Sequence, residues 1–165
     1  MSLKLAFGRD EPKESRRSDS RNLVRFLVGE TCYAFDVGAV EEVANPAGLT
    51  ALPEMGAAIA GVTDHRGRIV PVVDLRAKFG APALTSRQTK WLLMRSSYGL
   101  VGFVVDRVLD VVSAEGPMNP APRLGAPGTT RAIVGVVNVD GVLVFVLDED
   151  AEASIVANVD LSAGP

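Results

Sequence analysis

The sequence contains one cysteine and one histidine, which limits the chemistry that its side chains can perform. Cys32 alone cannot form an intrachain disulfide, and a zinc site needs several nitrogen, sulfur or carboxylate ligands around one point. Cys32 also lies in an apolar stretch that favours a strand, where a buried structural thiol is more common than a reactive one. We therefore expect neither a metal nor a cofactor.

The signatures of common enzyme classes are also missing. The chain has no G-x-S-x-G nucleophile elbow, and none of its glycine pairs leads into the Lys-Ser or Lys-Thr of a phosphate-binding loop. The His-Arg-Gly triplet at 65–67 lacks the glycine-rich nucleotide loop and the metal-binding triplet that accompany a kinase catalytic loop. We expect a protein that is not an enzyme and has no catalytic residues.

An excess of basic charge and long apolar runs are absent as well. The net charge is −3, and six of the 17 Lys and Arg residues lie in the first 21 positions, so the remaining chain is acidic. Such a body lacks the basic stripe that binds a phosphate backbone, which argues against nucleic acid. No apolar run approaches the roughly 18 residues of a membrane span. A cytoplasmic protein without direct membrane insertion fits best.

Aromatic residues make up only 5% of the chain, whereas apolar residues reach 47% and valine dominates them. Valine favours strands because its branched Cβ packs well on a pleated surface. We expect a flexible polar tail over residues 1–21 and ordered structure from Leu23 onward. The stretch VTDHRGRIVPVVDL, residues 62–75, predicts a hairpin that turns near His65–Gly67.

The chain also repeats itself. Residues 33–43 align with 101–111, and residues 59–74 align with 133–148. The second block pairs glycine with glycine at a strand start and at a hairpin turn, so we assign structural turn roles to Gly61, Gly67, Gly135 and Gly141. Asp74 and Asp148 end equivalent strands and are expected to cap short helical turns. Each half then carries about five strands, enough for a small closed barrel.

The stretch GVTDHRGRIVPVVDLRAKFG, residues 61–80, resembles the signature of the CheW-like chemotaxis coupling domain. The likeness extends to the segments that form the repeat. It implies a mainly all-β fold of two tandem SH3-like five-stranded barrels with short helical segments. The domain would cover 22–150, with a first barrel at about 22–82, a second at about 88–150, and a short helix or tail over 151–165.

The resemblance also implies a function. Members are non-enzymatic adaptors that join the regulatory domain of a CheA-type histidine kinase to the cytoplasmic tips of methyl-accepting chemoreceptors. Such a protein is cytoplasmic and is recruited to receptor arrays. The alternative is a small-molecule-binding or regulatory module on the same double barrel, with its ligand in a cleft between the barrels.

The family pattern points to two segments that face the receptor or kinase. The first supplies Val40, Glu41, Glu42 and Val43, and the second supplies Asp64, His65 and Arg66. We expect Glu42 and Arg66 to form a bidentate pair, with Val40 as an exposed apolar anchor. Two alternatives stay open. Val40 could face the core, because the alternation of apolar and polar residues across 36–43 is irregular, and Arg66 could be an ordinary solvated arginine at a turn. Asp64-His65 stands where the family commonly has Asn-Leu, which puts the partner preference in doubt.

Overall fold

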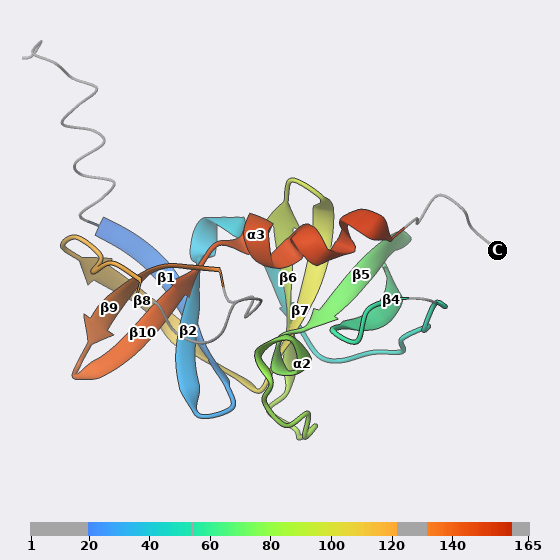
Figure 1. The fold of residues 1–165 in the computed structure, drawn as a ribbon, viewed down its shortest axis with the longest axis horizontal. Coiled ribbons are helices and arrows are strands. Elements are labelled where there is room, and N and C mark those ends of the chain that lie inside the picture. Colours follow the sequence, from blue (N-terminus) through green and yellow to red (C-terminus); the bar gives the residue numbers. More distant parts are fainter. Residues whose placement is uncertain (1–19, 54, 122–131, 160–165) are drawn as a thin grey trace, which may run out of the picture.

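The protein folds into two five-stranded sheets that lie side by side (Figure 1). The computed structural model describes residues 20–53, 55–121 and 132–159. The first half contains β1 (Ser20–Val28), β2 (Thr31–Asp36), η1 (Val37–Ala39), β3 (Val40–Ala44), β4 (Ile59–His65), β5 (Arg68–Asp74) and α2 (Leu75–Phe79). The second half contains β6 (Lys90–Ser96), β7 (Gly99–Val105), β8 (Arg107–Glu115), β9 (Ile133–Val139), β10 (Val142–Leu147), α3 (Glu149–Ala153) and η2 (Ser154–Asn158).

Each sheet takes strands from both halves of the chain. The first sheet has the order β8-β1-β2-β10-β9, and the second sheet has the order β3-β6-β7-β5-β4. The expected mainly β fold with five strands per unit is confirmed, but the tandem division at about residues 82–88 is wrong. The chain crosses to the other sheet after β2 and again after β7. The repeat makes β3 and β8 equivalent, so the local sequence pattern does not indicate which of the two sheets each strand joins.

The boundaries at the two ends of the domain also differ from expectation. Ser20 and Arg21, expected in the polar tail, belong to β1 and pair with β8. Residues 1–19 of that tail lie outside the described residues, as do 160–165 of the expected C-terminal segment. The described part of that segment is helical, because α3 runs directly into η2. No described helix has the length and apolar character needed to cross a membrane.

The structure reproduces the internal repeat in its backbone details. The two hairpins turn through equivalent residue pairs, with φ of 54° at Arg66 and 83° at Gly67, and 52° at Asp140 and 85° at Gly141. Both central residues have positive φ, as in the type I′ turn that suits the twist of a hairpin. The N-caps of α2 and α3 are equivalent as expected, because Asp74 accepts from the Arg76 amide and Asp148 accepts from the Asp150 amide.

Gly61 and Gly135 lie within β4 and β9, so the turn role expected for them is wrong. A Cβ added to Gly61 would meet the carbonyl oxygen of Thr50 at 2.7 Å. One added to Gly135 would meet the Met118 side chain at 2.8 Å. Both glycines therefore permit a passing chain segment to pair with the outer edge of the sheet.

The largest core cluster lies between the two sheets. Phe35 and Phe103, which are repeat equivalents, meet there with ring centroids 5.3 Å apart. Smaller clusters fill the interior of each sheet, one around Leu23, Ala34 and Val144 and one around Trp91. The shared cluster makes the two sheets one folding unit, because neither can bury its own half of the cluster alone.

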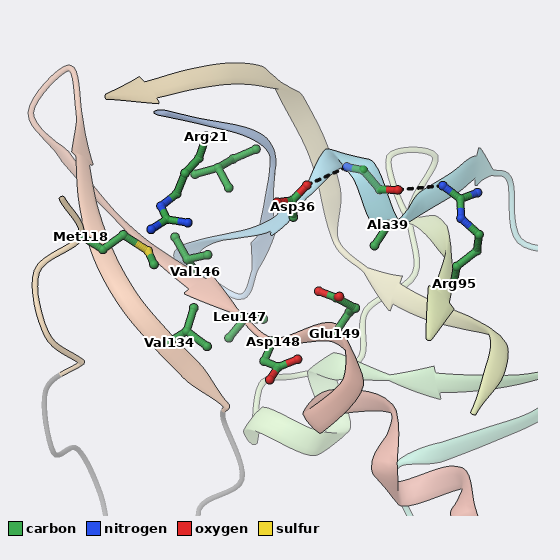
Figure 2. A pocket seen from close by; sticks show the side chains of 12 residues that line it. Arg21, Asp36, Ala39, Arg95, Met118, Val134, Val146, Leu147, Asp148 and Glu149 are labelled. Carbon is green, nitrogen blue, oxygen red and sulfur yellow. Dashed lines mark hydrogen bonds between the residues drawn. The ribbon is translucent and has the colours of Figure 1, made fainter. Parts of the chain in front are cut away.

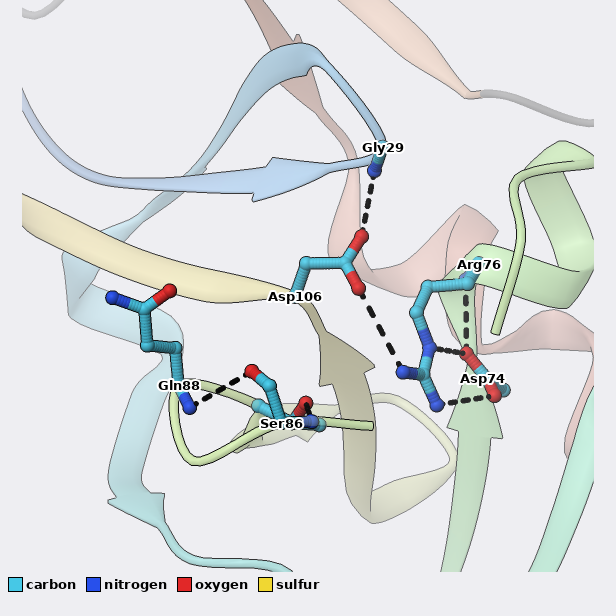
Figure 3. A network of polar contacts seen from close by, with 7 residues as sticks. Gly29, Asp74, Arg76, Ser86, Gln88 and Asp106 are labelled. Atoms are coloured by element: carbon cyan, nitrogen blue, oxygen red, sulfur yellow. Dashed lines mark hydrogen bonds and ion pairs between the residues drawn. The ribbon is translucent and has the colours of Figure 1, made fainter. Parts of the chain in front are cut away.

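Two buried polar contacts connect the sheets beside this core. Arg76 of α2 binds Asp74 through two hydrogen bonds and lies 3.7 Å from Asp106, which accepts from the Gly29 amide in the β1–β2 turn (Figure 3). The hydrogen bonds that Arg76 donates to Asp74, followed by the charges of Asp74 and Asp106, raise the pKa of Arg76 against the effect of burial. Lys78 and Glu152 form the second contact.

Candidate docking surface

The two segments that the sequence pointed to meet where the two edge strands of the second sheet come together. β3 and β4 lie at opposite ends of its strand order, and the sheet curls until their side chains touch. The Glu42 Oε1 atom lies 3.2 Å from His65 Nε2 and 3.2 Å from Arg66 Nη2. One carboxylate oxygen from β3 therefore faces two nitrogen atoms of the β4–β5 hairpin.

The geometry of this contact differs from the expected bidentate pair. Arg66 reaches Glu42 through one nitrogen atom, and its side chain is 73% exposed. The His65 side chain is only 17% exposed, and its Nε2 atom makes no hydrogen bond of good geometry despite its proximity to Glu42. The contact is thus an electrostatic bridge whose basic partners differ in exposure.

Glu41 forms a second bridge with two arginines that the sequence analysis missed. Its Oε2 atom lies 3.4 Å from Arg68 Nη1, and its Oε1 atom lies 3.8 Å from Arg95 Nη1. Arg95 also donates to the Gly38 carbonyl at 2.7 Å, which ties β6 to η1. Arg68 could have been found, because the hairpin register places it opposite His65. Arg95 is more than 50 residues from Glu41 and carries no local signal.

We call the set of residues Glu41, Glu42, His65, Arg66, Arg68 and Arg95 the polar seam. Asp64 does not take part, since its carboxylate accepts from the Gly67 amide at 2.8 Å and holds the hairpin turn. Its role in the structure is therefore to shape the loop that presents Arg66.

The two valines of β3 lie on the other face of that strand. The register shifts between Val40 and Glu42, so Glu41 forms a bulge. Because of this bulge, Val40 and Val43 both pair with residues of the shared core, and Glu42 pairs with Leu93 on the inner face of the second sheet. Val40 is half-buried against the core, whereas Val43 is 45% exposed. The exposed valine of β3 is therefore Val43, and the exposure expected for Val40 is wrong.

A cavity of about 520 Å³ opens beside η1, between the first sheet and Arg95 (Figure 2). Three of its polar groups already serve the backbone: Asp36 accepts from the Gly38 amide, Arg95 donates to the Gly38 carbonyl, and Asp148 caps α3. Burial, followed by the charges of neighbouring carboxylates, raises the pKa of Glu149 at its rim. These engaged groups do not converge on a ligand position, so the cavity gives the ligand-module alternative little support.

The described part of the chain was next compared with the ligand sets that bind metal ions in proteins. Its histidine, cysteine, aspartate and glutamate residues form no group of three or more that could hold a metal ion. Cys32 is buried, and burial raises the pKa of its thiol, as a structural cysteine in a strand requires.

Comparisons with known proteins agree with one another. Residues 22–154 match the CheW-like domain family. The chain is 32% identical over 132 residues to the chemotaxis protein CheW of Thermotoga maritima, covering 78% of this chain and 84% of that protein. It is 28% identical over 113 residues to the chemotaxis protein CheW of Helicobacter pylori, covering 67% and 68%. The fold is similar to the crystal structure of the scaffolding protein TtCheW from Thermoanaerobacter tengcongensis, with a TM-score of 0.72, 25% identity, and coverage of 79% and 85%.

Proposed function

The chain belongs to the CheW-like domain family and is a non-enzymatic chemotaxis scaffold, and on this basis we propose that it joins two specific partners. One is the regulatory domain of a CheA-type histidine kinase. The other is the cytoplasmic domain of a methyl-accepting chemoreceptor. The protein then works in the cytoplasm at receptor arrays, where both partners are present.

The contact of β3 with the β4–β5 hairpin carries the proposal for the site. It presents charged groups on one face of the β3 edge and an exposed valine on the other. An apolar anchor bordered by polar groups is the usual composition of a protein interface. We assign direct partner contact to Glu41, Glu42, Val43, His65 and Arg66.

Val40 and Asp64 belong to the same proposed surface in supporting roles. Val40 packs its half-buried side chain against the shared core and so fixes the position of β3. Asp64 fixes the turn that carries Arg66. Substitution of either residue would act on binding through the backbone it holds.

Isothermal titration calorimetry tests the proposal. The full chain is titrated with the kinase regulatory domain and, separately, with a chemoreceptor cytoplasmic fragment from the same genome. We expect Arg66→Glu and Val43→Asp each to raise the Kd for at least one partner about tenfold, the loss of about 1.4 kcal/mol typical of a moderate interface residue. Arg87→Glu, in the exposed loop before β6, makes the same charge change outside the seam and serves as the control.

Two results would contradict the assignment. If wild-type protein binds both partners and the folded seam variants bind with unchanged Kd, the docking surface lies elsewhere. If wild-type protein binds neither partner, the partners themselves are wrong. Circular dichroism of each variant shows that the fold is intact before either conclusion is drawn.

A further inference from the structure

The cavity beside η1 has an apolar end. Figure 2 shows Met118, Val134 and Val146 together at that end of the cavity, which measures about 520 Å³. Val146 is buried, but Met118 is only half-buried and Val134 is 49% exposed. Apolar side chains that remain accessible around a hollow gain free energy when another apolar segment covers them. The cavity therefore has the walls of a docking groove.

The chain enters the fold beside this cavity. β1 begins at Ser20, and Arg21 already lines the cavity. Residues 1–19 are therefore attached at its border. Any apolar segment among them is tethered to the groove by its own backbone.

The beginning of the chain contains such a segment. Residues 8–19 hold only glycine, proline, serine and an equal number of basic and acidic side chains, four of each. In contrast, Leu3, Leu5 and Phe7 stand at alternate positions in residues 3–7, LKLAF. Alternate side chains of an extended chain point to the same side, so these three can form one apolar face. The sequence thus consists of a short apolar motif followed by a polar linker.

The linker is long enough to bring the motif to the cavity. Its 12 residues span at most about 40 Å when fully extended. A short polar linker gives the segment that it tethers an effective concentration of about 1 mM. A motif that binds with an intrinsic Kd as weak as about 1 mM would then occupy the cavity about half of the time.

Charge also matches the motif to the cavity. The charged residues that line the cavity are two arginines and three carboxylates, which gives a net charge of −1; they are Arg21, Arg95, Asp36, Asp148 and Glu149. The motif carries one charged side chain, Lys4, so its net charge is +1. On an extended chain Lys4 points away from the apolar face and so toward the rim, where Glu149 lies.

We propose that residues 3–7 dock in the cavity beside η1 of the same molecule. Their three apolar side chains cover Met118 and Val134, and Lys4 lies beside Glu149. Docking in this way makes the motif an internal competitor for any partner that uses the cavity. The inference does not depend on the identity of the kinase or of the receptor.

A nitroxide spin label on the full chain tests the docking. Ser2→Cys places the label beside the motif, and the native Cys32 is buried and stays unlabelled. We expect the label to broaden the backbone amide signals of Ala39, Val134 and Glu149. The loop between α2 and β6 lies at the lower edge of Figure 1, whereas α3 begins at the upper edge, so amides of that loop should not be broadened.

Variants of the motif separate docking from mere proximity. Leu5→Ser/Phe7→Ser should weaken the intrinsic Kd at least tenfold, so the broadening at the cavity should fall about fivefold. Lys4→Glu should reduce it about twofold, because the exposed pair with Glu149 becomes a repulsion. The matched control Glu14→Ser/Arg17→Ser changes two linker residues without changing the net charge, and it should leave the broadening unchanged.

Two results would overturn the proposal. The same broadening in Leu5→Ser/Phe7→Ser as in the parent protein would mean that the motif passes near the cavity without binding it. A mixture of isotope-labelled protein without the nitroxide and spin-labelled protein without the isotope reports contacts between molecules. Cavity signals broadened as strongly in that mixture would show that a second copy supplies the occupant.

Discussion

Lys78 and Glu152 give the clearest test of how the two halves of the chain are held together. They are 74 positions apart, the offset of the second repeat block, so equivalent positions of α2 and α3 have become opposite charges in contact. Glu152 is fully buried, and Lys78 retains only 8% exposure of its side chain. The second Glu152 oxygen accepts from the Ala132 amide at 2.7 Å. We predict that Lys78→Met destabilises the protein strongly.

The magnitude follows from the charge that is left behind. Removal of one partner from a buried ion pair costs about 3–5 kcal/mol, because the other charge stays buried without compensation. Methionine conserves most of the lysine volume, so loss of packing adds little. The double variant Lys78→Met/Glu152→Gln removes both charges and keeps an acceptor for the Ala132 amide. It should therefore lie within about 1.5 kcal/mol of wild type.

Urea unfolding followed by circular dichroism measures these differences. With a slope of about 2 kcal/mol per molar urea, Lys78→Met should lower the midpoint by about 2 M, and the double variant should restore most of it. The Lys78→Met loss should also depend on pH. Burial raises the pKa of Glu152, and Lys78 opposes that rise. Without Lys78 the pKa rises further, so the variant keeps its stability below the ordinary glutamate pKa of about 4.3 and loses it as the pH rises through the folded-state value.

A loss below about 1 kcal/mol at pH 7.5, or the same loss at pH 5 and pH 8, would refute the reasoning. Either result would mean that water reaches Glu152 or that its carboxyl is already neutral beside Lys78. A double variant as unstable as Lys78→Met would instead show that shape, rather than charge, makes the contact important.

Two further predictions concern the backbone and the surface. Gly61→Ala should lower the free energy of unfolding by about 2 kcal/mol or more, because the added Cβ would meet the Thr50 carbonyl at 2.7 Å. Gly67→Asn should lower it by less than about 1 kcal/mol, because Gly67 has positive φ, which asparagine tolerates, and open space around it. Thermal melting of both variants distinguishes the two effects. Hydrogen bonds from Arg25 lower the pKa of Asp110, so this exposed pair contributes stability above the ordinary aspartate pKa and loses it as the pH falls through the folded-state value. Asp110→Asn should remove that acid dependence at a cost under about 1 kcal/mol at pH 7, checked by urea unfolding at pH 7 and pH 3.

The sequence predicted local features well because their causes are local. The 59–74 hairpin follows from strand-forming residues around a glycine turn, and both caps follow from an aspartate at a strand end. The repeat offset of 74 residues places β4 on β9 and α2 on α3 with identical bounds. These relations hold whatever the rest of the chain does.

The features that sequence analysis missed depend on partners far away in the chain. A repeat does not reveal that the two halves exchange strands, because a sheet built from one half and a sheet built from both halves have the same local sequence pattern. The bulge at Glu41 turns Val40 inward, and it depends on the register with β6. The contact between Lys78 and Glu152 did leave a signal, because the aligned helices carry opposite charges at one repeat position.

The proposed docking surface includes positions at which the two halves of the chain differ. The repeat equivalents of Glu42, His65, Arg66 and Arg68 are Asp110, Val139, Asp140 and Val142. In the first sheet, Asp110 binds Arg25 of the neighbouring strand, and its hairpin tip is acidic and apolar. The backbone of the two tips is nearly the same, so stability alone does not require different side chains. The proposed function requires two unlike ends, because a scaffold that joins two unlike partners binds each through a different surface, and a duplicated fold can supply them by changing residues at the edges of its sheets.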